Sequence, residues 1–169
     1  MVVLGIDTAL RCTGYGVIRM DSANDARILD CGVIRNPAAA PHSECLRRLA
    51  GGTRELVARF NPAAAVVEGA FYQKNVKTAM VLSMARGAIV AALAEAGVPV
   101  WAYAPRKAKQ AVVGNGNAAK DQVAAVLAAL FRLRCEDIVL DATDALALAL
   151  CHGRTAMSPA ADVLLDKPL

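Results

Sequence analysis

Four acidic side chains stand at positions where carboxylates can do chemistry together. Asp7 ends an apolar run at the start of the chain, and Glu68 ends a second such run. Asp141 and Asp144 are three residues apart in an alanine- and leucine-rich stretch, and this spacing places both on one face of a helix. Each acid alone could be an ordinary turn cap or a solvated group. Asp144 is less ordinary, because a carboxylate in so apolar a helix needs a partner or a cation.

The chemistry that such a set supports is metal-assisted hydrolysis of a phosphodiester. Acids at the carboxyl ends of two strands and on a packed helix can meet at one sheet edge. There a close pair repels by roughly 4 kcal/mol at an effective dielectric constant of about 20. Two divalent cations would balance the four charges, and oxygen ligands without Cys or His favour Mg²⁺ or Mn²⁺ over zinc. Two such ions about 4 Å apart activate a water and stabilise the leaving oxygen, so no covalent nucleophile is needed.

The elements that would position these acids form a mixed sheet. The hydrophobic pattern predicts strands at 1–7, 14–20, 27–34, 63–68 and 98–103. It predicts helices at 41–60, 76–96, 119–133 and 137–152, and a short basic helix that begins at Pro105. The first three strands follow one another through short connections, as in an antiparallel meander, and the later strands are reached through helical crossovers. We therefore predict an α/β fold in which helices flank a mixed five-stranded sheet.

Length and composition favour one packed domain. The 169 residues fit a single domain, and a hydrophobic content of 56% with a mean hydropathy of +0.39 excludes intrinsic disorder. We assign residues 1–154 to one domain and expect 155–169 to be a poorly ordered tail. A membrane span is not expected, because Arg86 interrupts the most apolar stretch, 78–94. Asp7 interrupts the first apolar segment, so we expect no signal peptide.

The cysteines indicate the cellular compartment, and the charge distribution indicates the kind of binding partner. The five cysteines are scattered without a C-x-x-C pair, and the two histidines are far apart, which argues against a zinc site or a disulfide framework and favours a reducing cytoplasm. Residues 71–120 contain seven cations and one anion, a local charge of +6, so the rest of the chain carries −2 of the net +4. This surplus suits a polyanionic partner such as nucleic acid, and it suits a solvated basic face equally well.

Six segments along the chain carry a family resemblance, in the order LGID, TGYGVI, EGAFYQKN, MARG, KQAVVGNGNAAKDQV and DATDALALAL. The chain resembles the RuvC-type crossover-junction endodeoxyribonucleases, which are Holliday-junction resolvases with a ribonuclease-H-like fold. The resemblance covers nearly the whole chain. It implies that the catalytic and metal-binding acids are Asp7, Glu68, Asp141 and Asp144. One departure is Thr8-Ala9, where the family usually has Pro-Gly after the first acid.

The resemblance also implies cofactors and partners. It implies Mg²⁺, with Mn²⁺ as a substitute and two ions per subunit, four-way junction DNA as substrate, and a homodimer. A branch-migration motor complex is the further partner expected in recombination and repair, inside a bacterial cytoplasm at the nucleoid. Lys109 and Lys120 correspond to the DNA-backbone lysines of the family. Phe71 corresponds to its junction-contacting aromatic residue.

The loop after Glu68 combines aromatic rings with a cation. Phe71, Tyr72 and Lys74 lie three, four and six residues after Glu68. An exposed ring can stack on an unpaired base for roughly 1–3 kcal/mol. From the residues alone, a core position for Phe71 and a half-buried Tyr72 are the simpler interpretation. With the resemblance we predict DNA contact for the loop. The glycine-asparagine loop at 113–117 lacks the G-K-[ST] ending of a phosphate-binding loop.

The predicted activity is resolution of four-way junctions by paired symmetric nicks. The alternatives are a ribonuclease-H-type nuclease on RNA–DNA hybrids and a non-catalytic nucleic-acid-binding domain of the same fold. An actin-like phosphotransferase is excluded because the chain is too short for two lobes. The helix predicted at 76–96 is apolar nearly all round, so it must be buried on more than one side. A second copy of the chain would cover its outer face, unless the helices from Ala119 onward do so.

Overall fold

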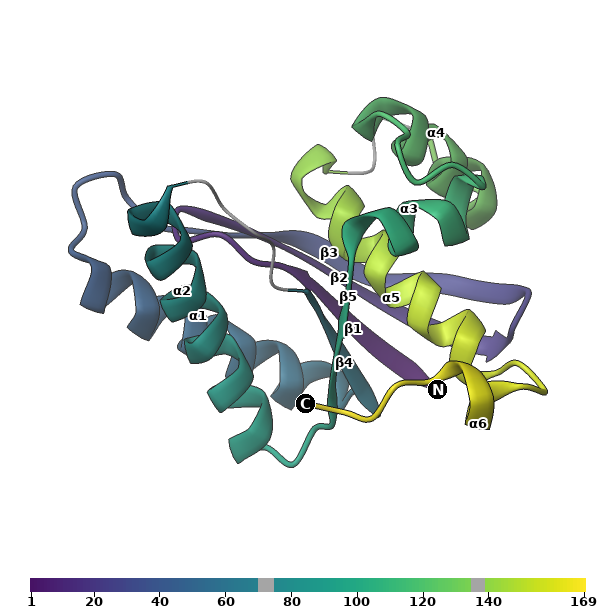
Figure 1. Cartoon of the computed structure of the whole chain (residues 1–169), viewed down its shortest axis with the longest axis horizontal. Helices are drawn as coiled ribbons and strands as arrows, with labels where there is room; N and C mark the ends of the chain where they lie inside the picture. The colour runs from purple at the N-terminus through teal and green to yellow at the C-terminus, as the bar shows by residue number, and fades with distance from the viewer. Residues whose placement is uncertain (70–74, 135–138) are drawn as a thin grey trace.

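A five-stranded mixed sheet with helices on both faces forms the framework of the molecule (Figure 1). The computed structural model describes residues 1–69, 75–134 and 139–169. The strands are β1 (Val2–Asp7), β2 (Cys12–Ser22), β3 (Asp25–Arg35), β4 (Ala64–Glu68) and β5 (Val100–Tyr103), arranged in the order β3-β2-β1-β4-β5. The first three are antiparallel, and β4 and β5 continue the sheet parallel to β1. The predicted α/β architecture is confirmed, including the antiparallel meander followed by parallel additions.

Helices cover the two faces separately (Figure 1). One face carries α1 (His42–Phe60) and α2 (Val76–Glu95), and the other carries α3 (Pro105–Val113), α4 (Lys120–Phe131) and α5 (Thr143–Ala156). Successive residues of β1 point to opposite faces, so Val3 joins the core under α5 whereas Leu4 and Ile6 join the core under α1 and α2. Because both faces are covered, β1 and β4 are continuous apolar runs that end in an acid.

Three glycines allow α5 to lie unusually close to the sheet. Gly5 and Gly16 face each other across β1 and β2, and Gly14 faces Asp7 two pairs further along. A Cβ at Gly5 would overlap the carbonyl oxygen of Ala145, and one at Gly14 would overlap that of Asp141. The missing side chains therefore set the depth at which the segment carrying the last two acids rests on the sheet.

The start of the last helix differs from the prediction. The sequence predicts one helix over 137–152 with both late acids on it, but Leu140–Ala142 forms a 3₁₀ helix, η2, and α5 begins only at Thr143. Asp141 and Asp144 therefore lie on different elements. The 3₁₀ helix has a period of three residues, so a spacing of i, i+3 does not separate it from an α-helix. The segment bends because η2 lies against β2 and β3.

The C-terminal tail follows the edge strand β5. After the short helix α6 (Ala161–Leu164), the Trp101 indole N–H donates to the carbonyl oxygen of Asp166 at 2.9 Å. The backbone N–H of Leu169 donates to the carbonyl oxygen of Val100 at 2.8 Å. These contacts shield an otherwise open sheet edge. The poor order expected for 155–169 stays a prediction, and a single domain over 1–154 does too.

Candidate active site

Three of the four predicted acids meet at the carboxyl edge of the sheet. Asp7 is the last residue of β1, Glu68 is the last residue of the neighbouring parallel strand β4, and Asp144 lies in the first turn of α5. All three line one small cavity of about 50 Å³. Lys109 of α3 lines the same cavity. The strand ends and the deep seat of α5 thus bring together carboxylates that are up to 137 positions apart in the sequence (144 − 7).

Glu68 is the most perturbed of these acids. Its burial raises the pKa of its carboxyl group, and a hydrogen bond with Asp7 and the charges of Asp7 and Asp144 raise it further, to about 8. The positive charge of Lys120 acts in the opposite direction. Near neutral pH, the Glu68 carboxyl group therefore keeps its proton in the metal-free protein and is hydrogen-bonded to Asp7. A carboxyl group whose pKa is raised this far above its ordinary value is typical of a functional site.

Two lysines hold Asp144. The Lys120 ammonium lies 3.2 Å from Asp144 Oδ2, and the Lys109 ammonium lies 3.9 Å from Asp144 Oδ1. Lys109 also donates to the carbonyl oxygen of Ala118 at 3.3 Å, which ties α3 to the start of α4. Partial burial opposes the charged form of Lys120, but the hydrogen bond and charge of Asp144 outweigh it and raise the pKa of the ammonium. Both lysines thus stand directly beside the acids.

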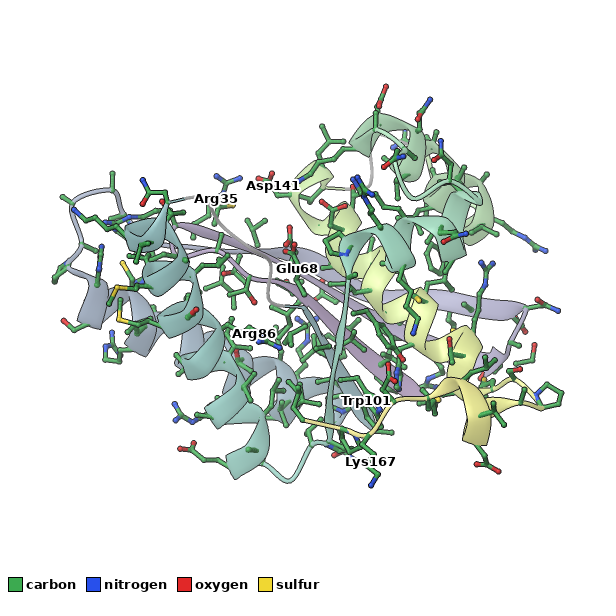
Figure 2. The ribbon with its side chains drawn as sticks, in the orientation of Figure 1. Arg35, Glu68, Arg86, Trp101, Asp141 and Lys167 are labelled. Atoms are coloured by element: carbon green, nitrogen blue, oxygen red, sulfur yellow. The ribbon has the colours of Figure 1, made fainter. Side chains whose placement is uncertain are left out.

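Asp141 does not line the cavity with the other three acids. Its Oδ2 accepts from Arg35 Nη2 at 3.4 Å and from the Cys12 thiol at 3.4 Å (Figure 2). Cys12 begins β2 and Arg35 ends β3, and the two residues are directly paired across the strands. Burial raises the pKa of the Cys12 thiol, and the bond to Asp141 raises it further. The quartet is therefore divided, with three acids at the cavity and one held at its rim.

The acids at the cavity suit a hard cation. Asp144 Oδ1 is buried and accepts no hydrogen bond, and the charges of Asp7 and Asp144 raise the pKa of Glu68, which shows that the three carboxyl groups act on one another. Oxygen donors of this kind are the ligands that Mg²⁺ and Mn²⁺ prefer. Within 1–69, 75–134 and 139–169, however, no three His, Cys, Asp or Glu side chains converge closely enough to form a complete cation site. The residues fit a divalent ion, and they would have to draw together to enclose it.

Comparison with known proteins decides the family. The family model described as "Crossover junction endodeoxyribonuclease RuvC" matches residues 3–152. The chain belongs to the RuvC family. A RuvC of Chlorobaculum parvum is 42% identical over 151 residues, which are 89% of this chain and 80% of that protein.

Solved RuvC structures share the fold over the full chain. The structure described as T. thermophilus RuvC in complex with Holliday junction substrate superposes with a TM-score of 0.89 at 36% identity, covering 100% of this chain and 99% of that one. The Thermus thermophilus RuvC structure gives a TM-score of 0.84, also at 36% identity and with full coverage of both chains. RuvC membership implies a divalent-metal nuclease, and it favours neither the ribonuclease-H-type alternative nor the non-catalytic one.

The unusual Thr8-Ala9 turn of this RuvC chain is closed by a side chain. The Ala9 N–H donates to Thr13 Oγ1 at 3.1 Å, and the Thr13 hydroxyl donates back to the Ala9 carbonyl oxygen. In the described part of the chain, the non-glycine residues with positive φ are Asn61 and Arg132, so Ala9 has an ordinary backbone conformation. The turn after the first acid therefore does not require the glycine that the family usually has there.

The structure brings to the acids further residues to which the sequence assigned no role. Thr8, Glu68 and Arg86 line a neighbouring cavity of about 260 Å³ between α2 and the end of β4. The Thr8 hydroxyl and the Arg86 Nε are buried there without a hydrogen-bond partner. The predicted DNA contacts Phe71, Tyr72 and Lys74 lie outside the described residues. The local sequence gives no sign of Arg35, which the strand register brings to the site, and the resemblance segment MARG contains Arg86 without assigning it a role.

Proposed function

We propose that this chain resolves four-way DNA junctions by paired symmetric nicks, through metal-assisted hydrolysis of phosphodiesters. The single observation that carries the proposal is the cavity at the carboxyl edge, where Asp7, Glu68 and Asp144 converge beside Lys109. This arrangement offers anionic oxygens for a cation and, directly next to them, ammonium groups for a phosphate. The closely related RuvC chains support junction DNA as the substrate.

Asp7, Glu68 and Asp144 would hold Mg²⁺, which Mn²⁺ can replace, and Asp141 would complete a site for two ions. Bound ions of this kind activate a water and stabilise the leaving oxygen. Glu68 must lose its proton to bind the ion, and cation charge beside the carboxyl group favours that loss. Asp141 must leave Arg35 and Cys12, which costs little because the exposed pair is weak.

DNA contacts follow from the cations around the acids. Lys120 and Lys109 neutralise Asp144 in the free protein, and each can transfer to a DNA phosphate once a divalent cation neutralises that carboxylate. Phe71, Tyr72 and Lys74 lie within six residues after Glu68 in the sequence. We assign to this loop the contact with distorted DNA next to the cut, with Phe71 stacking on an unpaired base.

The working unit that we propose is a twofold homodimer through α2. Val76, Met80 and Met84 on this helix are 71%, 62% and 43% exposed, whereas Ile89 and Leu93 are buried against the sheet. The alternative cover, the helices from Ala119 onward, is wrong because α4 and α5 pack on the opposite face (Figure 1). A second copy would cover the exposed methionines, and two identical sites would then face two equivalent strands of a junction.

The apolar exposed side of α2 and the proposed cellular location are both part of the proposed function. Among the described helices, α2 is long and apolar enough to cross a membrane by length and composition, but its buried side packs in the core. We therefore assign its apolar exposed side to a protein partner. Action in the cytoplasm, together with a branch-migration motor, completes the proposal, in line with scattered cysteines that lack a metal or disulfide pattern.

The test compares three substrates under two conditions. A synthetic four-way junction, a linear duplex of the same sequence and an RNA–DNA hybrid are incubated with the protein in Mg²⁺ or in EDTA. Symmetric nicks in the junction alone, and only with Mg²⁺, are expected. Cleavage of the hybrid in preference to the junction would support the ribonuclease-H-type alternative instead, and binding without cleavage in any metal would support a non-catalytic domain.

A further inference from the structure

A polar groove with a volume of about 560 Å³ runs between α1 and β3, apart from the acid cavity. Four arginines from the two elements line it, together with Glu55 as an acidic side chain of the groove itself. The four arginines are Arg35, Arg47, Arg48 and Arg59. The net charge of the sequence does not reveal this surface, because acidic residues elsewhere in the chain offset the charge of the arginines. In three dimensions the groove is a concentration of guanidinium groups without an assigned role.

The groove is continuous with the active-site edge. Arg35 lines it and also forms the ion pair with Asp141 at the rim of the acid site (Figure 2). Next to it, Arg48 donates from Nη2 to the Arg35 carbonyl oxygen at 3.3 Å and from Nε to Asn36 Oδ1 at 3.0 Å. No carboxylate forms an ion pair with Arg48 among the described residues. A chain that leaves the acids along this edge would meet Arg35 first and then Arg48.

The other two arginines hold exchangeable partners. Arg47 contacts Glu44 at 2.7 Å and Arg59 contacts Asp30 at 2.9 Å, and these guanidinium side chains are 71% and 68% exposed. The Arg47–Glu44 pair is exposed on both sides and contributes little to stability, whereas the Asp30 side chain is only 23% exposed. A phosphate can therefore replace or join the carboxylate on either arginine, and the planar fork of a guanidinium matches two phosphate oxygens at once.

The floor of the groove carries a second, independent signal. Gly51 and Gly52 lie side by side in the middle of α1, where glycine weakens a helix. Gly52 has a packing reason, because a Cβ there would lie 2.8 Å from Ile34 Cδ1. Gly51 has none, since a Cβ there would meet no atom within 4 Å. At Gly51 the missing side chain leaves the groove open, which suits close approach of a ligand to the helix.

We infer that this groove binds the sugar–phosphate backbone of one arm of the junction and guides it away from the cleavage site. The inference rests on the proposed function and deepens it, because it names where an arm lies. The contacts are to phosphates, so they add affinity and orientation without reading base sequence. Successive phosphates beyond the cut would contact Arg35 first and Arg48 next. The phosphates after these would contact Arg47 or Arg59.

The decisive variants place charge on the groove floor. Gly51→Glu fits without a clash and introduces a negative charge among the arginines, whereas Gly51→Ala fills the same space without charge. Both should fold at least as well as the wild type, since each replaces a mid-helix glycine. We expect Gly51→Glu to bind a four-way junction about three- to tenfold more weakly in Ca²⁺ at 0.1 M salt, and Gly51→Ala to bind like the wild type.

Charge removal supplies the matched comparison. Arg48→Gln should weaken junction binding and reduce the slope of log K against log salt by about one. Arg54→Gln is its control, because Arg54 is an exposed arginine of the same helix that pairs with Glu95 and does not line the groove. Glu55→Gln should strengthen binding, a gain that a merely structural role of the residue would not produce. Fluorescence anisotropy with long-armed and short-armed junctions measures all of these, and the effects should shrink when the arms are shortened.

The outcomes separate this inference from the proposed function. If the wild type cuts junctions but Gly51→Glu and Arg48→Gln bind long-armed junctions as tightly as their controls, the groove is not an arm site and the inference is overturned. If Arg48→Gln and Arg54→Gln lose the same junction affinity, the loss comes from the change in net charge alone. That result would also overturn the inference. If the wild type neither binds nor cuts junctions, the proposed function itself has failed.

Discussion

Replacement of Glu68 by Gln is expected to stabilise the metal-free protein while it abolishes cleavage. In the structure Glu68 is partly buried, hydrogen-bonds with Asp7 and faces the charges of Asp7 and Asp144, and these effects raise the pKa of its carboxyl group from 4.5 to about 8. The folded state therefore keeps a proton that the unfolded chain releases. Gln is neutral at every pH and has nearly the same shape, so it removes this cost without leaving a cavity.

The sign and the size follow from linkage between protonation and folding. An acid whose pKa is raised on folding opposes folding increasingly as pH rises from about 4.5 to about 8, and the full cost is present above that window. Because Glu68 is not fully buried, solvent reduces the effect to about 1–2 kcal/mol at pH 8. For a chain of this length that corresponds to a rise of roughly 3–6 °C in melting temperature. Near pH 5 the difference between the two proteins should nearly vanish.

Thermal unfolding in EDTA at pH 5 and pH 8 measures this effect. The control is Glu55→Gln, which makes the same chemical change at an exposed position on α1. Asp7→Asn should act in the same direction as Glu68→Gln, because the charge of Asp7 is one of the causes that raise the pKa of Glu68. Mg²⁺ should raise the melting temperature of the wild type at pH 8 more than that of Glu68→Gln. An equal shift at both pH values, or a lower melting temperature for Glu68→Gln at pH 8, would contradict the electrostatic argument.

Three further changes test separate parts of the structure. Asp144→Asn should lose cleavage in Mg²⁺ and keep junction binding, whereas full activity of this variant in single-turnover assays would remove Asp144 from the metal site. Lys120→Gln should weaken junction affinity and flatten its salt dependence by about one unit of slope, and an unchanged slope would leave this lysine only its pairing with Asp144. Met84→Glu should give a folded monomer by sedimentation, deficient in paired nicking, whereas a wild type that is monomeric at micromolar concentration and still makes paired nicks would contradict the dimer.

The sequence predicts most of the framework because the framework depends on local patterns. Alternation and continuous apolar runs locate all five strands to within a few residues, and the helix at 41–60 ends where Asn61 and Pro62 stop it. The placement of Asp7 and Glu68 follows for the same reason, since both simply end parallel neighbouring strands. A residue that ends a buried strand can be located from the sequence alone, because the apolar run ends at it.

The divided quartet could not be predicted in the same way. The i, i+3 spacing of Asp141 and Asp144 is satisfied by a 3₁₀ turn followed by an α-helix, and the two elements aim their side chains differently. The partners of Asp141 come from the cross-strand pair of Cys12 and Arg35, which are 23 residues apart in the sequence (35 − 12). A register of this kind depends on turn lengths and a bulge in β2 and β3, which the hydrophobic pattern does not specify.

The cations around the acids explain how the fold tolerates such a site. Without compensation, the acids at one edge would repel one another strongly, but Lys109 and Lys120 pair with Asp144, Arg35 pairs with Asp141, and the Glu68 carboxyl group keeps its proton near neutral pH. These compensations are exchangeable, because the side chains of Lys120 and Arg35 are 51% and 67% exposed and the Glu68 carboxyl group, with a pKa of about 8, loses its proton in mild base. The same groups that stabilise the free protein are therefore the ones that a divalent cation and a phosphate backbone can displace.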